Sequence, residues 1–245
     1  MHQNQLTTAA RDLANEYSGQ IQAIFNRIVD TQMDALEAAA GLMAETIESS
    51  GLIYTFGSGH SELVATEFYF RAGGLACCDV IHEKTFGRAE RLPGYASVVL
   101  DGCPITSRDL MIVISHSGRN PLPVEMAQIA QQRGIKVIGI TSLEHSRSVA
   151  PRQAGGEHLF EACDVVIDSC CPAGDALIEM KDDIRVGAAS TLAGVFIAQT
   201  LVCLTSAKLQ DHGVRPPIFL SMNLDEGDRH NQALLDKYYS RVRGL

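Results

Sequence analysis

Five short apolar runs, separated by polar loops and helical patterns, most constrain what this chain can fold into. The runs lie at residues 52–56, 75–81, 110–115, 136–141 and 164–168. Helical patterns lie between or after them, at residues 62–71, 121–133 and 186–209 and from about residue 228 onward. Apolar strands that alternate with helices indicate a parallel sheet that is covered on both faces. We therefore predict an α/β fold, a three-layer α/β/α sandwich with a five-stranded parallel sheet.

The first fifty residues predict one long helix before the first strand. Apolar residues recur there at steps of three and four, which places them on one helix face. They are Ile21, Ile24, Phe25, Ile28, Val29, Met33, Leu36, Ala40, Met43 and Ile47. A local break or cap is expected at residues 31–34. Such a stripe must be buried, either on its own domain or on a partner.

We expect residues 1–245 to form a single domain. Its parts are an N-terminal helical segment (1–50), an α/β core (51–210) and a C-terminal tail and helix (211–245). Within the core, residues 82–108 have a mixed pattern with two prolines. This segment predicts a short helix and a site loop.

The composition narrows the class of protein. With 245 residues, of which 46% are hydrophobic, the chain can build one large core. The formal net charge of −9 argues against a nucleic-acid partner, because phosphate contacts need a basic surplus. We find neither a stretch apolar enough to span a membrane nor a secretory signal, and we expect a cytoplasmic protein. Seven cysteines without a C-x-x-C pair predict reduced thiols, so we expect no metal and no cofactor.

The loop after the first strand carries candidate binding chemistry, because ligands bind beyond the carboxyl ends of the strands in an open parallel sheet. Residues 57–61 are Gly-Ser-Gly-His-Ser. They lack the third glycine of a dinucleotide fingerprint, and the chain has no Walker lysine for a nucleoside triphosphate. What remains is a glycine turn in which Gly59 and the Ser61 hydroxyl lie at a helix N-terminus. That arrangement binds an anion.

Residues 114–120, Ile-Ser-His-Ser-Gly-Arg-Asn, repeat this arrangement after the third strand. Ser115, Ser117 and Asn120 offer uncharged donors. Gly118 leaves the backbone accessible, and the helix that follows adds its dipole. Two such loops that meet at the switch point of the sheet would hold one phosphate group and the neighbouring hydroxyls.

The pattern G-x-G-x-S after the first strand, with S-x-S-G-x-N after the third, resembles the sugar isomerase (SIS) family of phosphosugar-binding domains. The resemblance extends from about Leu52 to Leu209 and includes a small-residue turn, 186–191, that opens the late helix. The whole chain is most similar to a bacterial subfamily of single SIS domains described as phosphosugar isomerases. The resemblance implies a flavodoxin-like fold. It also implies a sugar-phosphate ligand held by the loop serines and by Asn120, where the family has threonine or serine.

The same resemblance exposes two departures. In the isomerase domain of glucosamine-6-phosphate synthase, a base glutamate precedes the Gly-x-x-Ser-Thr turn, and the matching residue here is Arg185. In phosphoheptose isomerases a helix glutamate follows the first-loop serine, and the matching residue here is Arg71. Arginine cannot act as the base, although it can bind phosphate or stabilise an enolate.

Aldose–ketose isomerisation needs a base at C2 of the sugar and an acid that opens the ring. Glu83, which follows the second strand, is the first candidate base, and Glu67 and Glu90 are the second and third. Each could instead be a surface carboxylate or an ion-pair partner. His60 in the first loop and His230 near the start of the last helix are candidate acids. The resemblance implies that a C-terminal histidine can complete the site, sometimes from the neighbouring subunit.

Two reactions and one non-catalytic role stay open. Proton removal from C2 of a sugar or aminosugar 6-phosphate leads through an enol(ate) to isomerisation, or to elimination at C3 as in a dehydratase or etherase. The resemblance also admits a phosphosugar sensor or a protein-interaction scaffold. The first fifty residues are too few and too acidic for the DNA-binding domain of a regulator. We expect a homodimer or homotetramer with the site near the subunit interface.

Overall fold

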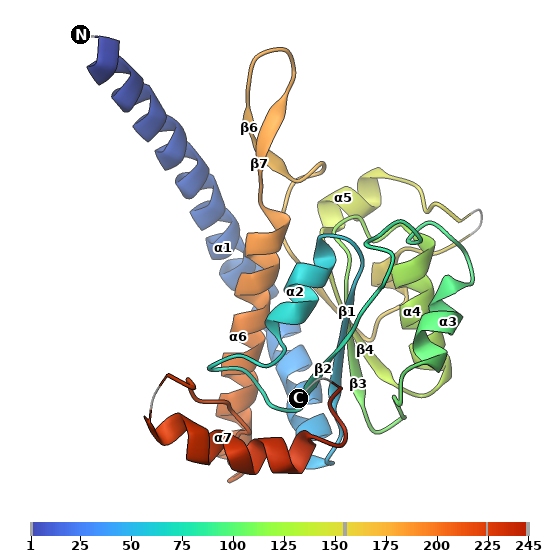
Figure 1. Cartoon of the computed structure of the whole chain (residues 1–245). Coiled ribbons are helices and arrows are strands. Elements are labelled where there is room, and N and C mark those ends of the chain that lie inside the picture. Colours follow the sequence, from blue (N-terminus) through green and yellow to red (C-terminus); the bar gives the residue numbers. More distant parts are fainter. Residues whose placement is uncertain (1, 154–155, 224, 244–245) are drawn as a thin grey trace.

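A five-stranded parallel sheet forms the centre of the molecule, as predicted (Figure 1). The computed structural model describes residues 2–153, 156–223 and 225–243, and the side chains of residues 10–153, 156–223 and 227–243. The strands are β1 Ile53–Gly57, β2 Cys78–Ile81, β3 Leu110–Ile114, β4 Lys136–Thr141 and β5 Val165–Asp168. Their order is β2-β1-β3-β4-β5, and every pair is parallel. The apolar runs that predicted these strands are buried because helices cover both faces of the sheet.

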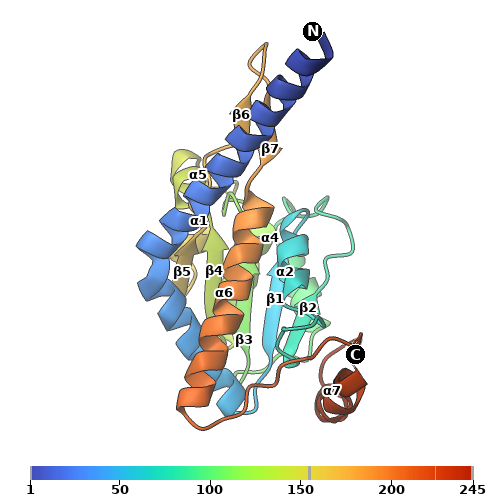
Figure 2. The ribbon, with the colours of Figure 1, turned by 90° about the vertical axis from the view of Figure 1, so that its left-hand side faces the viewer.

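Helices on the two faces complete the three layers. One face carries α1 His2–Glu48, α2 Ser61–Glu67 and α6 Ser190–Asp211, and the other carries α3 Tyr95–Asp101 and α4 Pro121–Gln132 (Figures 1 and 2). The remaining elements are α5 Leu143–Ser148, a 3-10 turn at Leu159–Glu161, the β6–β7 hairpin (Ala176–Glu179 and Arg185–Ala188) and α7 Asp225–Tyr238. The expected α/β/α sandwich with a long N-terminal helix is confirmed.

Helix α1 is continuous, so the predicted break at residues 31–34 is wrong. The Thr31 hydroxyl donates to the carbonyl of Arg27 at 2.7 Å, a bond that lets threonine sit inside a helix. From Ile21 onward the apolar stripe packs against α6 and the sheet, except for Val29, which is exposed. The N-terminal turns of α1 extend beyond the sheet, beside the β6–β7 hairpin (Figure 2).

The β6–β7 hairpin was not expected, because residues 186–189 were assigned to the start of the late helix. That helix begins at Ser190 instead. Gly187 has a φ of +79°, and a Cβ there would lie 2.9 Å from the Tyr17 ring. The Tyr17 hydroxyl also donates to the carbonyl of Ala188 at 2.7 Å. Contacts with α1, which are distant in sequence, therefore hold this segment in a strand.

Helix α6 is long and apolar enough, by length and composition, to cross a membrane, contrary to the sequence expectation. In the fold it packs along α1 and against α2. Its buried residues include Ala193, Ile197 and Leu201, which belong to the main core. The apolar residues of α6 therefore make it a core helix between α1 and α2.

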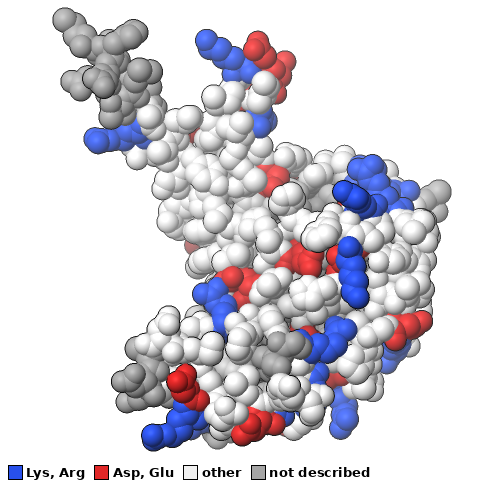
Figure 3. Space-filling model, in the orientation of Figure 1, with Lys and Arg blue, Asp and Glu red and all other residues white. Residues whose placement is uncertain are grey.

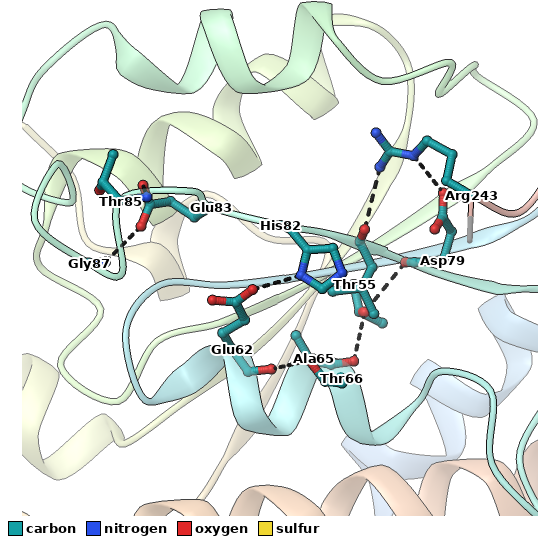
Figure 4. A network of polar contacts seen from close by, with 11 residues as sticks. Thr55, Glu62, Ala65, Thr66, Asp79, His82, Glu83, Thr85, Gly87 and Arg243 are labelled. Carbon is teal, nitrogen blue, oxygen red and sulfur yellow. Dashed lines mark hydrogen bonds and ion pairs between the residues drawn. The ribbon is translucent and has the colours of Figure 1, made fainter. Parts of the chain in front are cut away.

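The C-terminal segment is held to the edge strand β2 by an ion pair. The guanidinium of Arg243 donates from Nε to Asp79 Oδ2 at 3.0 Å, and the Asp79 side chain is buried (Figure 4). Strand β2 begins at Cys78, three residues later than predicted. Leu75, which was expected to start it, forms an antiparallel bridge with Ile218 instead. The chain after α6 therefore returns across the β2 edge of the sheet.

Truncation of Leu36 tests whether α1 is part of the core. Leu36 is fully buried, whereas Leu13 on the same helix is 42% exposed. We expect Leu36→Ala to lower the free energy of unfolding by about 2–5 kcal/mol, because it leaves a cavity. Leu13→Ala is the matched control, with an expected change within about 0.5 kcal/mol. Equal effects of the two substitutions in denaturant titrations would contradict this packing.

Candidate functional site

The candidate site lies where the chain leaves β1 and β3 in opposite directions. These two strands are neighbours, with Gly57 paired to Ile114, whereas β1 leads to β2 on its other side. The loops at residues 58–61 and 115–120 therefore emerge next to each other at the carboxyl edge of the sheet. This is the switch point at which doubly wound sheets bind ligands.

A cavity of about 190 Å³ lies between these two loops. It is lined by Ser58, Ser61, Glu90, Ser115, His116, Ser117, Asn120 and Pro123. The structure thus brings together the predicted side chains of Ser61, Ser115, Ser117 and Asn120. Most of the lining consists of uncharged hydroxyl and amide groups.

Several polar atoms of this region are buried without a hydrogen-bond partner among the described residues. They are Ser58 Oγ, Asn120 Oδ1, Ser169 Oγ and both ring nitrogens of His116. Leaving a buried polar atom unpaired costs about 1–3 kcal/mol, so native proteins rarely keep such atoms together without a function. Ser58, His116 and Asn120 line the cavity between the loops, so a polar ligand there would offer them partners.

Hydrogen bonds from behind fix the conformation of the second loop. The Ser115 hydroxyl accepts from the N–H of Gly118 at 3.2 Å, and the Ser146 hydroxyl donates to the carbonyl of Ser117 at 2.8 Å. Gly118 has a φ of +57°, and a Cβ there would lie 2.6 Å from Ser146 Oγ and 2.9 Å from Thr141 Oγ1. Gly118 is therefore required by the packing of the loop as well as by its backbone angle.

The start of α4 offers fewer backbone donors than the sequence predicted. Pro121 and Pro123 have no N–H group, and the N–H of Leu122 donates to the carbonyl of Glu90 at 3.1 Å. A ligand in the cavity would therefore rely mainly on the hydroxyl and amide side chains of the two loops rather than on this helix terminus.

The carboxylate of Glu83 organises a loop instead of lining the cavity. Its two oxygens accept from the N–H groups of Thr85 at 2.8 Å and Gly87 at 2.7 Å, and the side chain is only 2% exposed (Figure 4). A Cβ on Gly87 would lie 3.1 Å from the Cα of Gly59. Glu83 thus holds the segment after β2 against the first loop.

Glu90 is the candidate base that the structure places in the cavity. Its carbonyl is tied to the N–H of Leu122, which fixes the residue beside the second loop. Burial raises the pKa of its carboxyl above the ordinary value, against the smaller opposing effects of Arg91 and Arg152. A raised pKa makes the carboxylate a stronger base, which favours a role in proton transfer.

A second, narrow pocket continues from the first toward the start of α6. Its lining includes His60, Ser61, His116, Ser169, Ser190 and Thr191. Burial lowers the pKa of His116, whose ring meets that of His145 edge-on with centroids 4.9 Å apart. His60 lines the narrow pocket next to the cavity. His116, whose lowered pKa favours the neutral form, lines both pockets.

The start of α6 is arranged by Asp175. One of its carboxylate oxygens accepts from the N–H groups of Ala189 at 3.0 Å and Ser190 at 2.6 Å, and the other accepts from the Ser190 hydroxyl at 2.8 Å. This cap fixes Ser190 and Thr191 at the wall of the narrow pocket. Ser58, His116 and Ser169 were not assigned to the site from sequence, although all three lie in the strand-end loops that predicted it.

A family model for the SIS domain matches residues 16–142, just over half of the chain. The chain belongs to the SIS domain family. Full-length relatives support this assignment. A UPF0309 protein of Listeria innocua is 38% identical over 240 residues, which is 94% of this chain and 97% of that protein. A UPF0309 protein of Streptomyces coelicolor is 37% identical over 231 residues, covering 89% and 92% of the two chains.

Solved structures share the SIS fold at low sequence identity. A phosphoheptose isomerase of Francisella tularensis superposes with a TM-score of 0.57 at 17% identity, covering 81% of this chain and 98% of that one. A phosphoheptose isomerase of Neisseria gonorrhoeae gives a TM-score of 0.54 at 15% identity, covering 80% and 99% of the two chains. At these identities the likeness establishes the fold.

The other predicted residues lie outside the cavity. Glu67 accepts from Gln199 Nε2 at 2.9 Å and pairs with Arg71, which lines a separate hollow of about 250 Å³ beside the 219–223 segment. The guanidinium of Arg185 donates to carbonyls within the hairpin, at Ala176 and Leu177. Arg71 and Arg185, which stand where SIS isomerases have glutamates, therefore make contacts with nearby residues outside the cavity.

His230 is also distant from the cavity of its own chain. It lies on α7, which packs at the end of the domain opposite the strand-end loops (Figure 1). Its Nε2 is 2.8 Å from the carbonyl of Ile218 and its Nδ1 is 3.3 Å from Arg215. A role for His230 in the SIS site requires a neighbouring chain, which the sequence resemblance implied.

Substitution of Gly118 tests the rigidity of the second loop. Gly118→Ala should lower the free energy of unfolding by about 2 kcal/mol or more, because the added Cβ meets two hydroxyls and the backbone angle is strained. Gly59→Ala is the matched control: its φ is +60°, but nothing lies within 4 Å of the added Cβ. Its expected cost is about 1 kcal/mol. Equal costs in urea titrations would refute the packing argument.

Proposed function

We propose that this protein is an enzyme that binds a sugar or aminosugar 6-phosphate and abstracts the proton at C2. The observation that carries the proposal is the cavity between the two strand-end loops, with its buried, unpartnered Ser58 and Asn120 side chains. The hydroxyls of Ser61, Ser115 and Ser117 line the same space. A phosphate group accepts several hydrogen bonds at once, so it matches a surface built from hydroxyl donors.

The phosphate and the sugar would occupy different parts of the site. A volume of about 190 Å³ admits a phosphate group with part of its sugar. The narrow pocket toward α6 offers His60, His116 and Ser169 to the sugar hydroxyls. The phosphate supplies binding energy at a distance from C2, which an enzyme can use to orient the reacting carbon.

Glu90 is the base in this proposal. Its carboxylate takes the C2 proton, and the electron pair of the C–H bond forms an enol(ate) with the C1 carbonyl. Return of the proton to C1, with transfer of the O2 proton to the former carbonyl oxygen at C1, gives the ketose, which is isomerisation. Departure of the C3 substituent with its electron pair gives an unsaturated product, which is elimination. His60, which lines the narrow pocket, is the acid in this proposal and donates a proton to the ring oxygen or the leaving group.

A non-catalytic sensor is the competing function. It is favoured by the arginines at positions 71 and 185, where SIS isomerases carry glutamates, and by the local contacts that both arginines make. A sensor would bind the sugar phosphate and exchange no proton. Incubation of the protein with sugar and aminosugar 6-phosphates in D₂O, followed by NMR, separates the three functions. An isomerase introduces deuterium and forms a ketose, an elimination enzyme removes the C3 oxygen from the sugar, and a sensor leaves the sugar unchanged.

The proposal includes assembly into a dimer or tetramer. The N-terminal turns of α1 and the β6–β7 hairpin project together beyond the domain (Figure 2). Leu13 on α1, together with Ile184 and Val186 in or beside the hairpin, is exposed. Apolar groups on projecting elements favour a second copy as their cover. Assembly would also allow His230 of one chain to approach the cavity of another.

Removal of the loop hydroxyls tests phosphate binding. Ser61→Ala and Ser115→Ala should each weaken binding of glucosamine 6-phosphate about tenfold or more, because each removes a hydrogen bond to a charged group. Ser97→Ala is a suitable control, since Ser97 bonds only the carbonyl of Gly94 on α3. Unchanged affinity of both loop variants by calorimetry would contradict the two-loop cradle.

A pair of glutamine variants tests the identity of the base. Glu90→Gln should slow C2 exchange by about 10²–10⁴-fold and leave sugar-phosphate binding intact. In the parent protein the exchange rate should fall as the pH drops through the raised pKa of Glu90, because only the ionised carboxylate accepts a proton. Glu83→Gln is the comparison: a larger loss of exchange there, with binding and folding intact, would make Glu83 the base.

A further inference from the structure

Three arginines lie near one another and near the cavity that Glu90 lines. Arg91 follows Glu90 directly, and the carbonyl of Glu90 is bonded to the first turn of α4. Arg119 belongs to the second loop, and its carbonyl accepts from the N–H of Arg152 at 3.0 Å. Arg91, Arg119 and Glu90 all act on the charge of Arg152, so elements distant in sequence bring these side chains close together beside the cavity, at what we call its rim.

The three positive charges have one carboxylate near them, that of Glu90, which acts on Arg91 and Arg152. Among the described residues, none of the three forms an ion pair within 4.0 Å, and Arg119 Nε is shielded from solvent without an acceptor. Glu90 is the acidic group that acts on Arg152, while desolvation, Arg91 and Arg119 all lower the pKa of its guanidinium. Three positive charges beside a single carboxylate leave an excess of positive charge, which favours a bound anion.

This cluster stands out because the chain as a whole is acidic, with 29 acidic and 20 basic residues. Figure 3 shows Lys and Arg side chains gathered on the upper right of the face viewed, near the loops at the carboxyl edge of the sheet. The cavity beneath the rim is lined by uncharged donors apart from Glu90. The arginines thus add positive charge outside a cavity whose lining is mainly uncharged.

We infer that Arg91, Arg119 and Arg152 form a second anion-binding point, and that the substrate is a sugar phosphate with a second acidic group. The inference rests on the proposed function, since the first phosphate occupies the serine-lined cavity. The second group is a carboxylate or a phosphate, both of which arginine binds through paired N–H donors. It projects from the cavity toward the rim, at the end of the sugar that faces solvent.

Matched ligand pairs test this inference by calorimetry at fixed ionic strength. N-acetylglucosamine 6-phosphate and N-acetylmuramic acid 6-phosphate differ by the lactyl ether at O3, which carries a carboxylate. Fructose 6-phosphate and fructose 1,6-bisphosphate differ by one phosphate. We expect the ligand with the second acid to bind at least about tenfold more tightly in one of the pairs, because a charge-assisted hydrogen bond is gained.

Charge-removing variants locate the effect. Arg91→Gln and Arg152→Gln, both at exposed positions, should abolish the tenfold advantage and leave the affinity for the monophosphate within about twofold. Arg229→Gln, at an exposed position on α7, is the control and should keep the advantage. No advantage in either pair, or an advantage that survives both rim variants, overturns the inference while monophosphate binding upholds the proposed function. Failure of every ligand to bind contradicts the proposed function and the inference with it.

Discussion

The pairing of β1 with β3 determines where this protein can bind a ligand. Because Gly57 lies opposite Ile114, β1 and β3 end at the same level, and the loops that follow them lie at one edge of the sheet. The next connections run in opposite directions, toward β2 and toward β4, so no strand fills the space between them. The hydroxyls of Ser61 and Ser115 face one cavity as a result of this topology.

Carboxylates near this edge have separate structural and chemical tasks. Glu83 is saturated by backbone N–H groups and shapes the segment after β2, whereas Glu90 at the far end of that segment lines the cavity. Asp175 caps α6 in the same manner as Glu83 holds its loop. A carboxylate that already accepts strong hydrogen bonds is poorly suited to remove a proton, which is why the proposed chemistry falls to Glu90.

The sequence predicted the sheet and the serine loops because both depend on local patterns. Buried parallel strands are continuous apolar runs, and strand-end turns of Ser and Gly are recognisable from their composition. The β6–β7 hairpin was missed because contacts of Tyr17 with residues 187 and 188, far along the chain, hold it in place. The different positions of Glu83 and Glu90 could not be predicted from the sequence for the same reason. They depend on how residues 84–90 fold against the first loop and α4, in a segment without a regular pattern.

A crystal structure with glucosamine 6-phosphate tests the central claim most directly. The account predicts the phosphate between the two loops, within hydrogen-bond distance of the Ser61 and Ser115 hydroxyls. It also predicts that Ser58 Oγ donates to the ligand and that Asn120 Oδ1 accepts from a sugar hydroxyl, since both atoms are buried and unpaired in the free protein. A phosphate bound elsewhere, for example in the hollow beside Arg71, with these atoms still unpaired, would contradict it.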